Sequence, residues 1–315
     1  MVLQEAITDY FKSIRRLDAK TQKGYKQRMG VFYAWCKKQG IEQLESIKAN
    51  IVTDFVENLR QNHKSSYHSK SEVSTHTTAG YVRCIKAFLS FCLDDETYSH
   101  YVSYDTLRRI KLPKREKCVI QVFTDKQLQA LFAATQKEMN THLRLRDQAI
   151  LALLIDTGIR ANELCTLTLE HTHLEIEDPY ILVKGKGSKW REVGLGKHCR
   201  ETLQKYVETW RANTEGNDTT FIGRYNQEAL TVGGLERVLR RLAKWAKIKG
   251  IRCSPHSFRH TYATRFLLNG SGDLYKLSLL LGHEGTKVTE IYLKTVESWQ
   301  VRKRASSVLD EMQIN

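Results

Sequence analysis

The sequence predicts a mainly α-helical chain of two domains, the second of which carries a small antiparallel sheet. The length of 315 residues exceeds one ordinary small domain and suits two. With 41% hydrophobic residues and only 3 prolines, the chain can bury substantial cores and does not have the composition of a disordered protein. Apolar residues recur at helical spacing along much of the sequence, and one glycine-containing turn between two short runs supplies the strands.

The first third of the chain is predicted to form about four helices. Apolar side chains share one helical face in residues 25–36, and others share a face in residues 81–92. A third helix is expected within residues 47–59, and the polar stretch 62–78 is expected to be an exposed loop that leads into a helix. Several basic side chains here could contact phosphate, although each is also explained as part of a solvated helix face. They are Lys20, Lys23, Lys26, Arg28 and Lys86.

A basic segment with a proline separates the two domains. Residues 111–117 show no apolar periodicity, as is typical of a linker. Thr124 and Gln127 then match a capping box, which predicts the start of a new helix. We therefore expect a helical domain at 1–111, a linker at 112–122, a second domain at 123–297 and a C-terminal helix at 298–315.

The second domain is predicted to be mostly helical around a hairpin. Residues 147–156 have the composition of a buried helix that ends at Thr157-Gly158, and a further helix is expected at 161–167. Residues 180–184 and 189–193 flank a glycine turn and predict a β-hairpin. The remaining helices are expected at 197–211, 232–246, 255–268, 273–281 and 286–295.

Charge is the strongest signal in the composition. The chain holds 50 Lys and Arg against 35 Asp and Glu, a net charge of +15 with a pI near 9.4. A polyanionic partner explains this excess because neutralised phosphates release counterions. A merely soluble basic surface would explain it equally well.

The cysteines and the apolar stretches point to a cytoplasmic protein. Seven cysteines are scattered without a C-x-x-C pair, which favours neither a disulfide framework nor a zinc ribbon. The first residues lack the apolar core of a signal peptide, and the longest apolar stretch, residues 149–155, is too short to cross a bilayer. We expect reduced thiols and no membrane association.

Six polar residues of the second domain have the chemistry needed to hold and attack one phosphodiester. They are Arg160, Lys186, His256, Arg259, His283 and Tyr292. They lie in the segments TGIRANEL, KGKGSKWR, PHSFRHTYAT and LLGHEGTKVTEIYL. In this order and spacing the set resembles the tyrosine recombinases, also called phage-integrase-type site-specific recombinases, in their two-domain, Xer-like arrangement. The resemblance covers the whole chain and implies a helical DNA-binding domain of the SAM-like, core-binding type followed by a catalytic domain.

Arg160 and Lys186 are expected to act on the phosphate and on the leaving group. A guanidinium can hold two phosphate oxygens, and Glu163, one helical turn on, can position Arg160. A plain surface ion pair is the alternative. A lysine on a glycine turn can reach a departing oxygen and donate a proton, and Lys184 and Lys189 could do the same. The resemblance points to Lys186 among the three.

His256 and Arg259 are expected on one face at the start of a helix that Ser254-Pro255 opens. Arg259 would be the second phosphate clamp, and His256 a proton carrier or phosphate donor. His260 is expected to brace the helix. A zinc site from Cys253, His256 and His260 is the alternative, but no fourth ligand is evident.

His283 and Tyr292 complete the set. His283 follows a glycine that ends a helix, and it can donate to a phosphate oxygen. Tyr292 lies between Ile291 and Leu293, where a tyrosine taken alone is usually a packing residue. The order and spacing of the other five residues favour the nucleophile. The residues after it, Leu293 and Lys294, differ from the threonine and histidine of many relatives.

The resemblance implies a covalent mechanism. The tyrosine attacks a scissile phosphate, a 3′-phosphotyrosyl link forms and a 5′-hydroxyl leaves, which then attacks a partner duplex and exchanges strands through a Holliday junction. No metal and no other cofactor is required, since the covalent link conserves the bond. The implied partners are double-stranded DNA with inverted-repeat core sites and further copies of the chain, as a homotetramer on two duplexes. An accessory or sister recombinase is a further candidate partner.

Two features of this interpretation stay open in the sequence. The tail after Ser298 has apolar residues at helical spacing and is expected to contact a neighbouring protomer, although it could instead dock on its own domain. The enzyme is expected to integrate, excise or resolve a mobile element. The alternatives are a chromosome-dimer-resolving recombinase, a type IB topoisomerase-like enzyme and a DNA-binding relative without catalysis.

Overall fold

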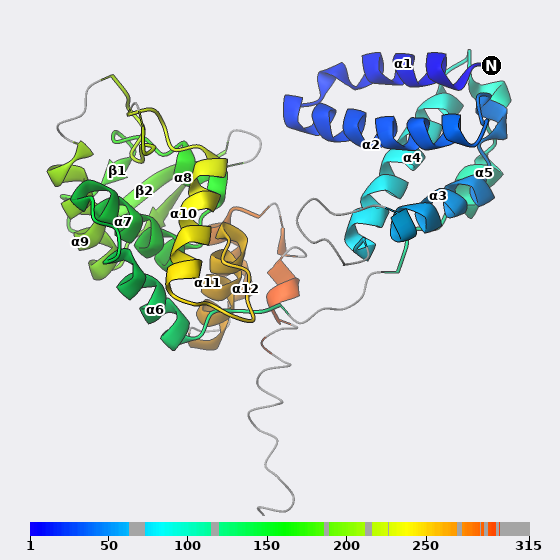
Figure 1. The fold of residues 1–315 in the computed structure, drawn as a ribbon. Coiled ribbons are helices and arrows are strands. Elements are labelled where there is room, and N and C mark those ends of the chain that lie inside the picture. Colours follow the sequence, from blue (N-terminus) through cyan, green and yellow to red (C-terminus); the bar gives the residue numbers. More distant parts are fainter. Residues whose placement is uncertain are drawn as a thin grey trace, which may run out of the picture. The chain divides into compact units, whose positions relative to one another are not determined.

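The chain forms two compact units, Met1–Cys118 and Val119–Asn315, in a computed structural model (Figure 1). The structure describes residues 1–62, 73–114, 120–185, 189–211, 216–225, 227–269, 273–283, 285–286, 289–293 and 296. The expected C-terminal helix at 298–315 lies outside these residues. Within them, no helix combines the length and the apolar character that a membrane span needs.

The first unit is helical, as the sequence predicts. Its helices are α1 (Leu3–Ser13), α2 (Ala19–Lys38), α3 (Ala49–Asn62), α4 (Thr75–Asp94) and α5 (Tyr104–Arg109). Short 3-10 turns lie at Ile14–Arg16, Leu44–Ser46 and Ser99–Tyr101. Aromatic rings join the helices in the core: Phe55 of α3 lies 5.0 Å from Phe32 of α2 and 5.8 Å from Tyr81 of α4, between ring centroids.

Most of the basic side chains expected to contact phosphate are exposed, but Lys86 is not available for that role. Its Nζ donates to the carbonyls of Leu107 and Ile110, at 2.9 and 3.0 Å. These carbonyls lie at the C-terminal end of α5, where a helix leaves acceptors without partners. The interpretation of Lys86 as a phosphate contact is therefore wrong; it caps a helix and holds α5 against α4.

The second unit is mostly helical with one small sheet, which confirms the predicted fold class. Its elements are α6 (Asp125–Thr135), α7 (Thr141–Thr157), α8 (Ala161–Cys165), β1 (Thr172–His173), β2 (Tyr180–Lys184), β3 (Trp190–Gly194), α9 (Lys197–Thr209), α10 (Val232–Trp245), α11 (Pro255–Asn269) and α12 (Leu274–Leu281). Residues 289–293 are also helical. The capping box of Thr124 and Gln127 forms as predicted and begins α6.

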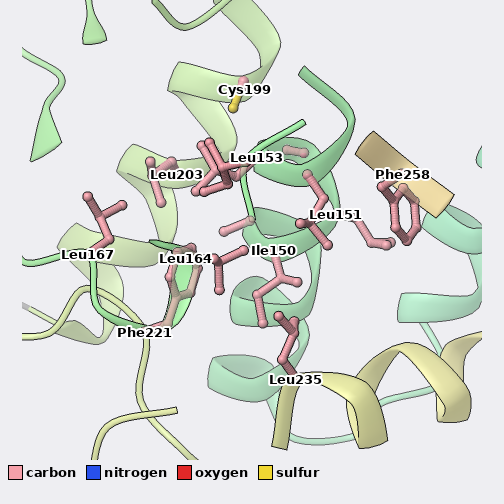
Figure 2. Close-up of a cluster of buried hydrophobic side chains, with 14 of the residues drawn as sticks. Ile150, Leu151, Leu153, Leu164, Leu167, Cys199, Leu203, Phe221, Leu235 and Phe258 are labelled. Carbon is pink, nitrogen blue, oxygen red and sulfur yellow. The ribbon is translucent and has the colours of Figure 1, made fainter. Parts of the chain in front are cut away.

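Helix α7 is the centre of this unit's core. Its residues 149–154 are apolar and buried on all sides, and Ile150, Leu151 and Leu153 are fully buried. Figure 2 shows these side chains among others from α9, α10 and α11. The helix ends at Gly158, whose φ of +60° is the left-handed conformation that glycine adopts most easily. A Cβ at Gly158 would lie 2.8 Å from the Tyr262 ring, so this junction packs directly on α11.

The sheet has the antiparallel order β1-β2-β3. The predicted hairpin is confirmed, with its second strand one residue later than expected. Val183 faces Arg191 and Lys184 faces Trp190 in the register of β2 and β3. Strand alternation buries Val183 and Val193 and leaves Lys184 and Trp190 exposed, so the sheet has one inner and one outer face.

A buried cluster of ion pairs lies beside the core at the start of α7. Asp147 is completely buried and accepts from Arg146, with Asp147 Oδ1 and Arg146 Nη2 2.9 Å apart; it also pairs with Arg241 of α10. Arg241 pairs in addition with Glu138, at 3.2 Å. Each charge is compensated by its neighbours, so removal of one leaves another buried and unpaired.

Replacing Asp147 with alanine should therefore lower the free energy of unfolding of the second unit by about 3–5 kcal/mol. The matched control is Asp125→Ala, because Asp125 is exposed and pairs with Arg265 in the same unit. That change should cost less than about 1 kcal/mol. Urea unfolding followed by tryptophan fluorescence measures both, and equal losses would contradict the role given to the buried cluster.

Candidate active site

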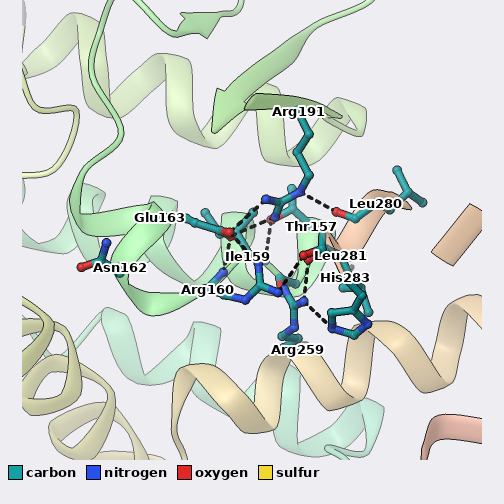
Figure 3. Close-up of polar contacts among 12 residues, drawn as sticks. Thr157, Ile159, Arg160, Asn162, Glu163, Arg191, Arg259, Leu280, Leu281 and His283 are labelled. Atoms are coloured by element: carbon teal, nitrogen blue, oxygen red, sulfur yellow. Dashed lines mark hydrogen bonds and ion pairs between the residues drawn. The ribbon is translucent and has the colours of Figure 1, made fainter. Parts of the chain in front are cut away.

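Three arginines from three different elements meet at the C-terminal end of α12 (Figure 3). Arg191 Nε of β3 donates to the carbonyl of Leu280 at 2.9 Å. Arg259 Nη2 of α11 donates to the carbonyl of Leu281 at 2.6 Å. Arg160, the residue just before α8, donates from its Nη2 to the carbonyl of Gly282 at 2.9 Å. The last carbonyls of a helix lack internal partners and carry its negative dipole end, so they attract cations.

Glu163 holds two of these arginines. Its carboxylate accepts hydrogen bonds from both terminal nitrogens of Arg191, each at 2.9 Å. It also accepts hydrogen bonds from Arg160 Nη1 and from the Arg160 backbone N–H, each at 2.8 Å. Burial alone would raise the pKa of Glu163, but the hydrogen bonds from Arg191 and Arg160 outweigh it and lower the pKa to about 2. These contacts agree with the expectation that Glu163 positions Arg160. The alternative, a plain surface ion pair, does not agree with them, because the Glu163 side chain is only 3% exposed.

Arg259 is the most deeply buried of the three arginines. It is 4% exposed, and its Nη1 donates to the carbonyl of Gly158 at 3.0 Å. Burial, with the nearby charge of Arg160, lowers its pKa to about 10, so the guanidinium remains charged at neutral pH. Arg160 is the more accessible partner, with a side chain 35% exposed. Both guanidinium groups are thus fixed by backbone carbonyls of the same helix end.

His283 is neutral and oriented from both sides. Its Nε2 lies 2.9 Å from Arg259 Nη2, which can only donate, and its Nδ1 lies 2.8 Å from Thr289 Oγ1. This network assigns the proton to Nδ1. Burial and the charges of Arg259 and Arg160 lower the pKa of His283 to about 4. To donate to a phosphate oxygen through Nε2, the ring must gain a proton there and give up its contact with Arg259.

Tyr292 lies beside these groups and is 3% exposed. Its ring is parallel to that of His283, with centroids 6.5 Å apart, and 5.3 Å from that of His260. Burial raises the pKa of Tyr292, while the charge of Arg259 and a hydrogen bond with it act in the opposite direction. The tyrosine is therefore both packed, as a core residue is, and in contact with the arginine cluster.

His256 and His260 lie on successive turns of α11, with ring centroids 4.0 Å apart. The His256 side chain is exposed. Its pKa is lowered because neighbouring residues shield part of the ring from water and because the charge of Arg259 is close. The pKa of His260 falls to about 4 because of burial and the charges of His256 and Arg259. His260 contacts the Tyr292 ring and so does more than brace its own helix.

No group of three or more His, Cys, Asp or Glu side chains suited to a metal occurs among the described residues. Cys253, one ligand of the alternative zinc site, is half-buried, and burial raises the pKa of its thiol to about 12.

Lys186 belongs to residues 186–188, which lie outside the described residues, so its position is not part of this geometry. The residue before it is next to the cluster: a Cβ on Gly185 would lie 3.5 Å from Arg191 Nη1 and 3.8 Å from Glu163 Oε1. The backbone N–H of Gly185 donates to the carbonyl of Lys189 at 2.8 Å and closes the turn.

Arg191 and Thr289 are site residues that the sequence analysis missed. Arg191 could have been found by strand alternation, because it shares the inner face with Val193. An arginine on a buried face needs a buried acceptor, and Glu163 is one. Thr289 gives no such signal, since its contact with His283 depends on how residues 283 and 289 fold back on each other.

Comparison with known proteins identifies the family of the chain. The phage integrase family matches residues 121–298, more than half of the chain. A tyrosine recombinase XerC from Anoxybacillus flavithermus is 30% identical over 273 residues, which cover 85% of this chain and 84% of that protein. A tyrosine recombinase XerD from Listeria monocytogenes is 30% identical over 283 residues, 88% of this chain and 89% of that one.

Solved structures share the fold. The XerH site-specific recombinase bound to its palindromic difH substrate superposes with a TM-score of 0.76 at 21% identity, covering 94% of this chain and 82% of that chain. The chain belongs to the phage integrase family of tyrosine recombinases, as its residue pattern indicates. It is a site-specific recombinase, an enzyme that breaks and rejoins DNA.

The lowered pKa of Glu163 makes the free energy of unfolding of the second unit depend on pH. Its pKa falls from 4.5 to about 2 on folding, so its stabilisation is complete above the unfolded value and is lost as pH falls towards the folded value. Such a shift corresponds to roughly 3 kcal/mol. Glu163→Gln should therefore destabilise the unit at pH 7, and the gap to wild type should close between about pH 5 and pH 2.

Urea unfolding at a series of pH values tests this expectation. Glu170→Gln is the control, because Glu170 is exposed and close in sequence. A gap between wild type and Glu163→Gln that stays constant down to pH 2 would show that the carboxylate charge is not the stabilising feature.

Proposed function

We propose that Tyr292 is the nucleophile of strand cleavage and that Arg160 and Arg259 hold the scissile phosphate. The observation that carries this proposal is that His283 bonds to Arg259 and its ring lies parallel to that of Tyr292, beside a second guanidinium fixed to the same helix end. A phosphate bound to Arg160 and Arg259 would lie next to the tyrosine. The two charges would then stabilise the additional negative charge of the phosphorane transition state.

The remaining residues are given supporting roles. His256 is exposed, which suits a group that exchanges protons with the substrate or donates to a phosphate oxygen. His283 donates to the phosphate once its ring is protonated at Nε2. Lys186 protonates the departing 5′-oxygen, and its neighbour Gly185 lies beside Glu163 and Arg191. Every group named in this step comes from the protein.

The step exchanges one bond for another and moves two protons. Tyr292 Oη gives its proton to His256, the proposed proton carrier, and forms a bond to phosphorus, while the bond to the 5′-oxygen breaks and that oxygen takes a proton from Lys186. A 3′-phosphotyrosyl link and a free 5′-hydroxyl result. Rejoining is the reverse reaction with the 5′-hydroxyl of another strand, so the phosphodiester bond energy is conserved.

The covalent intermediate is the direct test. With nicked duplexes that carry the recombination site, wild type should form a protein–DNA adduct that survives denaturant, and Tyr292→Phe should form none. Arg160→Ala should lower the rate of adduct formation by about 10²-fold or more, as loss of a preorganised charge does elsewhere. An adduct in Tyr292→Phe would assign the nucleophile to another residue.

We propose further that residues 1–111 bind DNA. A cavity of about 270 Å³ lies between α2 and α4, lined by Tyr25, Arg28, His76, Thr77, Gly80, Arg83 and Cys84. This described lining contains no carboxylate. Arg28 and Arg83 are exposed, and Arg28 Nη1 contacts the carbonyl of Gly24 at 3.4 Å. Guanidinium groups in such a position suit backbone phosphates, which position a protein on DNA.

If Arg28 and Arg83 each neutralise one phosphate, their joint replacement by alanine should weaken DNA binding and make it less dependent on salt. The slope of log K against log salt concentration should decrease by about 2. The charge-matched control is Arg108→Ala with Arg109→Ala, whose side chains pair with Asp105. Fluorescence anisotropy at several salt concentrations measures both slopes, and equal decreases would mean that net charge alone is responsible.

The assembly and the biological role follow from the same proposal. A strand exchange of this kind needs two duplexes, so we propose inverted-repeat core sites bound by a homotetramer, with residues 298–315 contacting a neighbouring protomer in the cytoplasm. We propose a mobile element as the substrate. Because the chain is similar to tyrosine recombinases named XerC and XerD, resolution of chromosome dimers is the alternative role. A type IB topoisomerase-like activity would relax supercoils without recombinant products.

A further inference from the structure

His260 of α11 contacts both the proposed nucleophile and the proposed proton carrier. Its ring centroid lies 4.0 Å from that of His256, one helical turn before it, and 5.3 Å from that of Tyr292. The ring planes meet at 66° and 60°, so both contacts are edge to face. In the part of the chain that the structure describes, no ring contact joins His256 directly to Tyr292. His260 is therefore the ring that connects the two.

The three rings differ in their access to water. Tyr292 is 3% exposed, His260 is half-buried and His256 is exposed. The proton that Tyr292 gives up therefore starts inside the protein, whereas the carrier meets the solvent. A base must lie within hydrogen-bond reach of the proton that it removes, or be connected to it through one intervening molecule. His260 lies where such an intermediate is needed.

The Nδ1 atom of His260 is able to accept a proton. It is buried and has no hydrogen-bond partner among the described residues. Burial and the charges of His256 and Arg259 lower the pKa of His260 to about 4, so its ring is neutral at pH 7. A neutral imidazole donates at one nitrogen and accepts at the other. With its proton on Nε2, His260 presents a buried acceptor at Nδ1, and leaving such an atom unpaired costs free energy that an arriving donor would recover.

We propose that His260 relays the phenol proton from Tyr292 to His256. As Tyr292 Oη bonds to phosphorus, its proton passes to His260 Nδ1, and the proton on His260 Nε2 passes to the neutral ring of His256. His260 changes tautomer and stays neutral, while His256 becomes the imidazolium. The surrounding charges suit this role, because they disfavour a proton that remains on His260. This inference rests on the proposed roles of Tyr292 and His256.

A more acidic nucleophile separates proton removal from the other steps. The experiment compares natural Tyr292 with a fluorinated tyrosine at the same position, whose phenol has a lower pKa and needs less help from a base. The readout is the rate of adduct formation on nicked duplexes. His260→Phe keeps an aromatic ring but can neither accept nor donate a proton. It should slow the natural phenol by about 10²-fold or more, and the loss with the fluorinated phenol should be smaller by about 10-fold or more.

Two further variants lie on the same helix. Thr264, one turn after His260, is 3% exposed, and its Oγ1 is also buried without a partner among the described residues. Thr264→Val removes that polar atom with little change of shape and should leave the rates with both phenols unchanged. His256→Ala removes the proposed acceptor and should reproduce the pattern of His260→Phe. A misfolded fraction would lower the rates with both phenols by the same factor, so it would not change the ratio of the two losses.

Each result decides for or against the relay. A wild-type rate for His260→Phe, or an equal loss with both phenols, would overturn it and assign the ring to packing or to DNA binding. A changed ratio in Thr264→Val would overturn it too, since any polar group on this helix would then have the same effect. An equal loss with both phenols in His256→Ala would reject His256 as the carrier and, with it, the last transfer of the relay. An adduct in Tyr292→Phe would instead be a failure of the proposed nucleophile.

Discussion

The C-terminal end of α12 is the point on which the geometry of the catalytic unit depends. Three successive carbonyls at this end, the last two of the helix and that of its C-cap Gly282, each accept a hydrogen bond from a different guanidinium: Leu280 from Arg191, Leu281 from Arg259 and Gly282 from Arg160. These arginines come from the hairpin, from α11 and from the junction of α7 and α8. A single helix end therefore sets the positions of elements that are distant in sequence. It also places His283 and the helical residues 289–293, which follow directly in the chain, against the same groups.

Three guanidinium groups in one place repel one another, and the structure compensates them only in part. Glu163 is the carboxylate that bonds to Arg160 and Arg191, and the helix end supplies partial negative charge. The remaining positive field lowers the pKa of His283 and His260, in addition to burial. A phosphodiester would relieve this repulsion, because each of its oxygens can accept from the clustered donors. The site thus carries uncompensated positive charge where its proposed substrate would bind, and this charge, together with burial, lowers the pKa of His283 to about 4.

The sequence was informative where local patterns determine structure. The helices, the hairpin, the capping box at Thr124 and the ion pair of Arg160 with Glu163 follow from periodicity, turn residues and short-range spacing. The contacts between distant segments did not follow. Arg191 was missed because its acceptors lie 28 residues before it and 89 residues after it. Lys86 was misassigned because the carbonyls it caps belong to α5, a short helix with little periodicity.

The burial of Tyr292 has a chemical consequence beyond packing. The phenol is 3% exposed, and burial raises its pKa, so the free site disfavours the phenolate that would attack phosphorus in the proposed step. Arg259 bonds to His283, whose ring lies parallel to that of Tyr292, and in the proposed step Arg259 bonds to the phosphate as well. Binding of the phosphate would therefore rearrange the hydrogen bond of Arg259 with His283. In the proposed mechanism, the scissile phosphate would thus act on the surroundings of Tyr292 through Arg259 and His283.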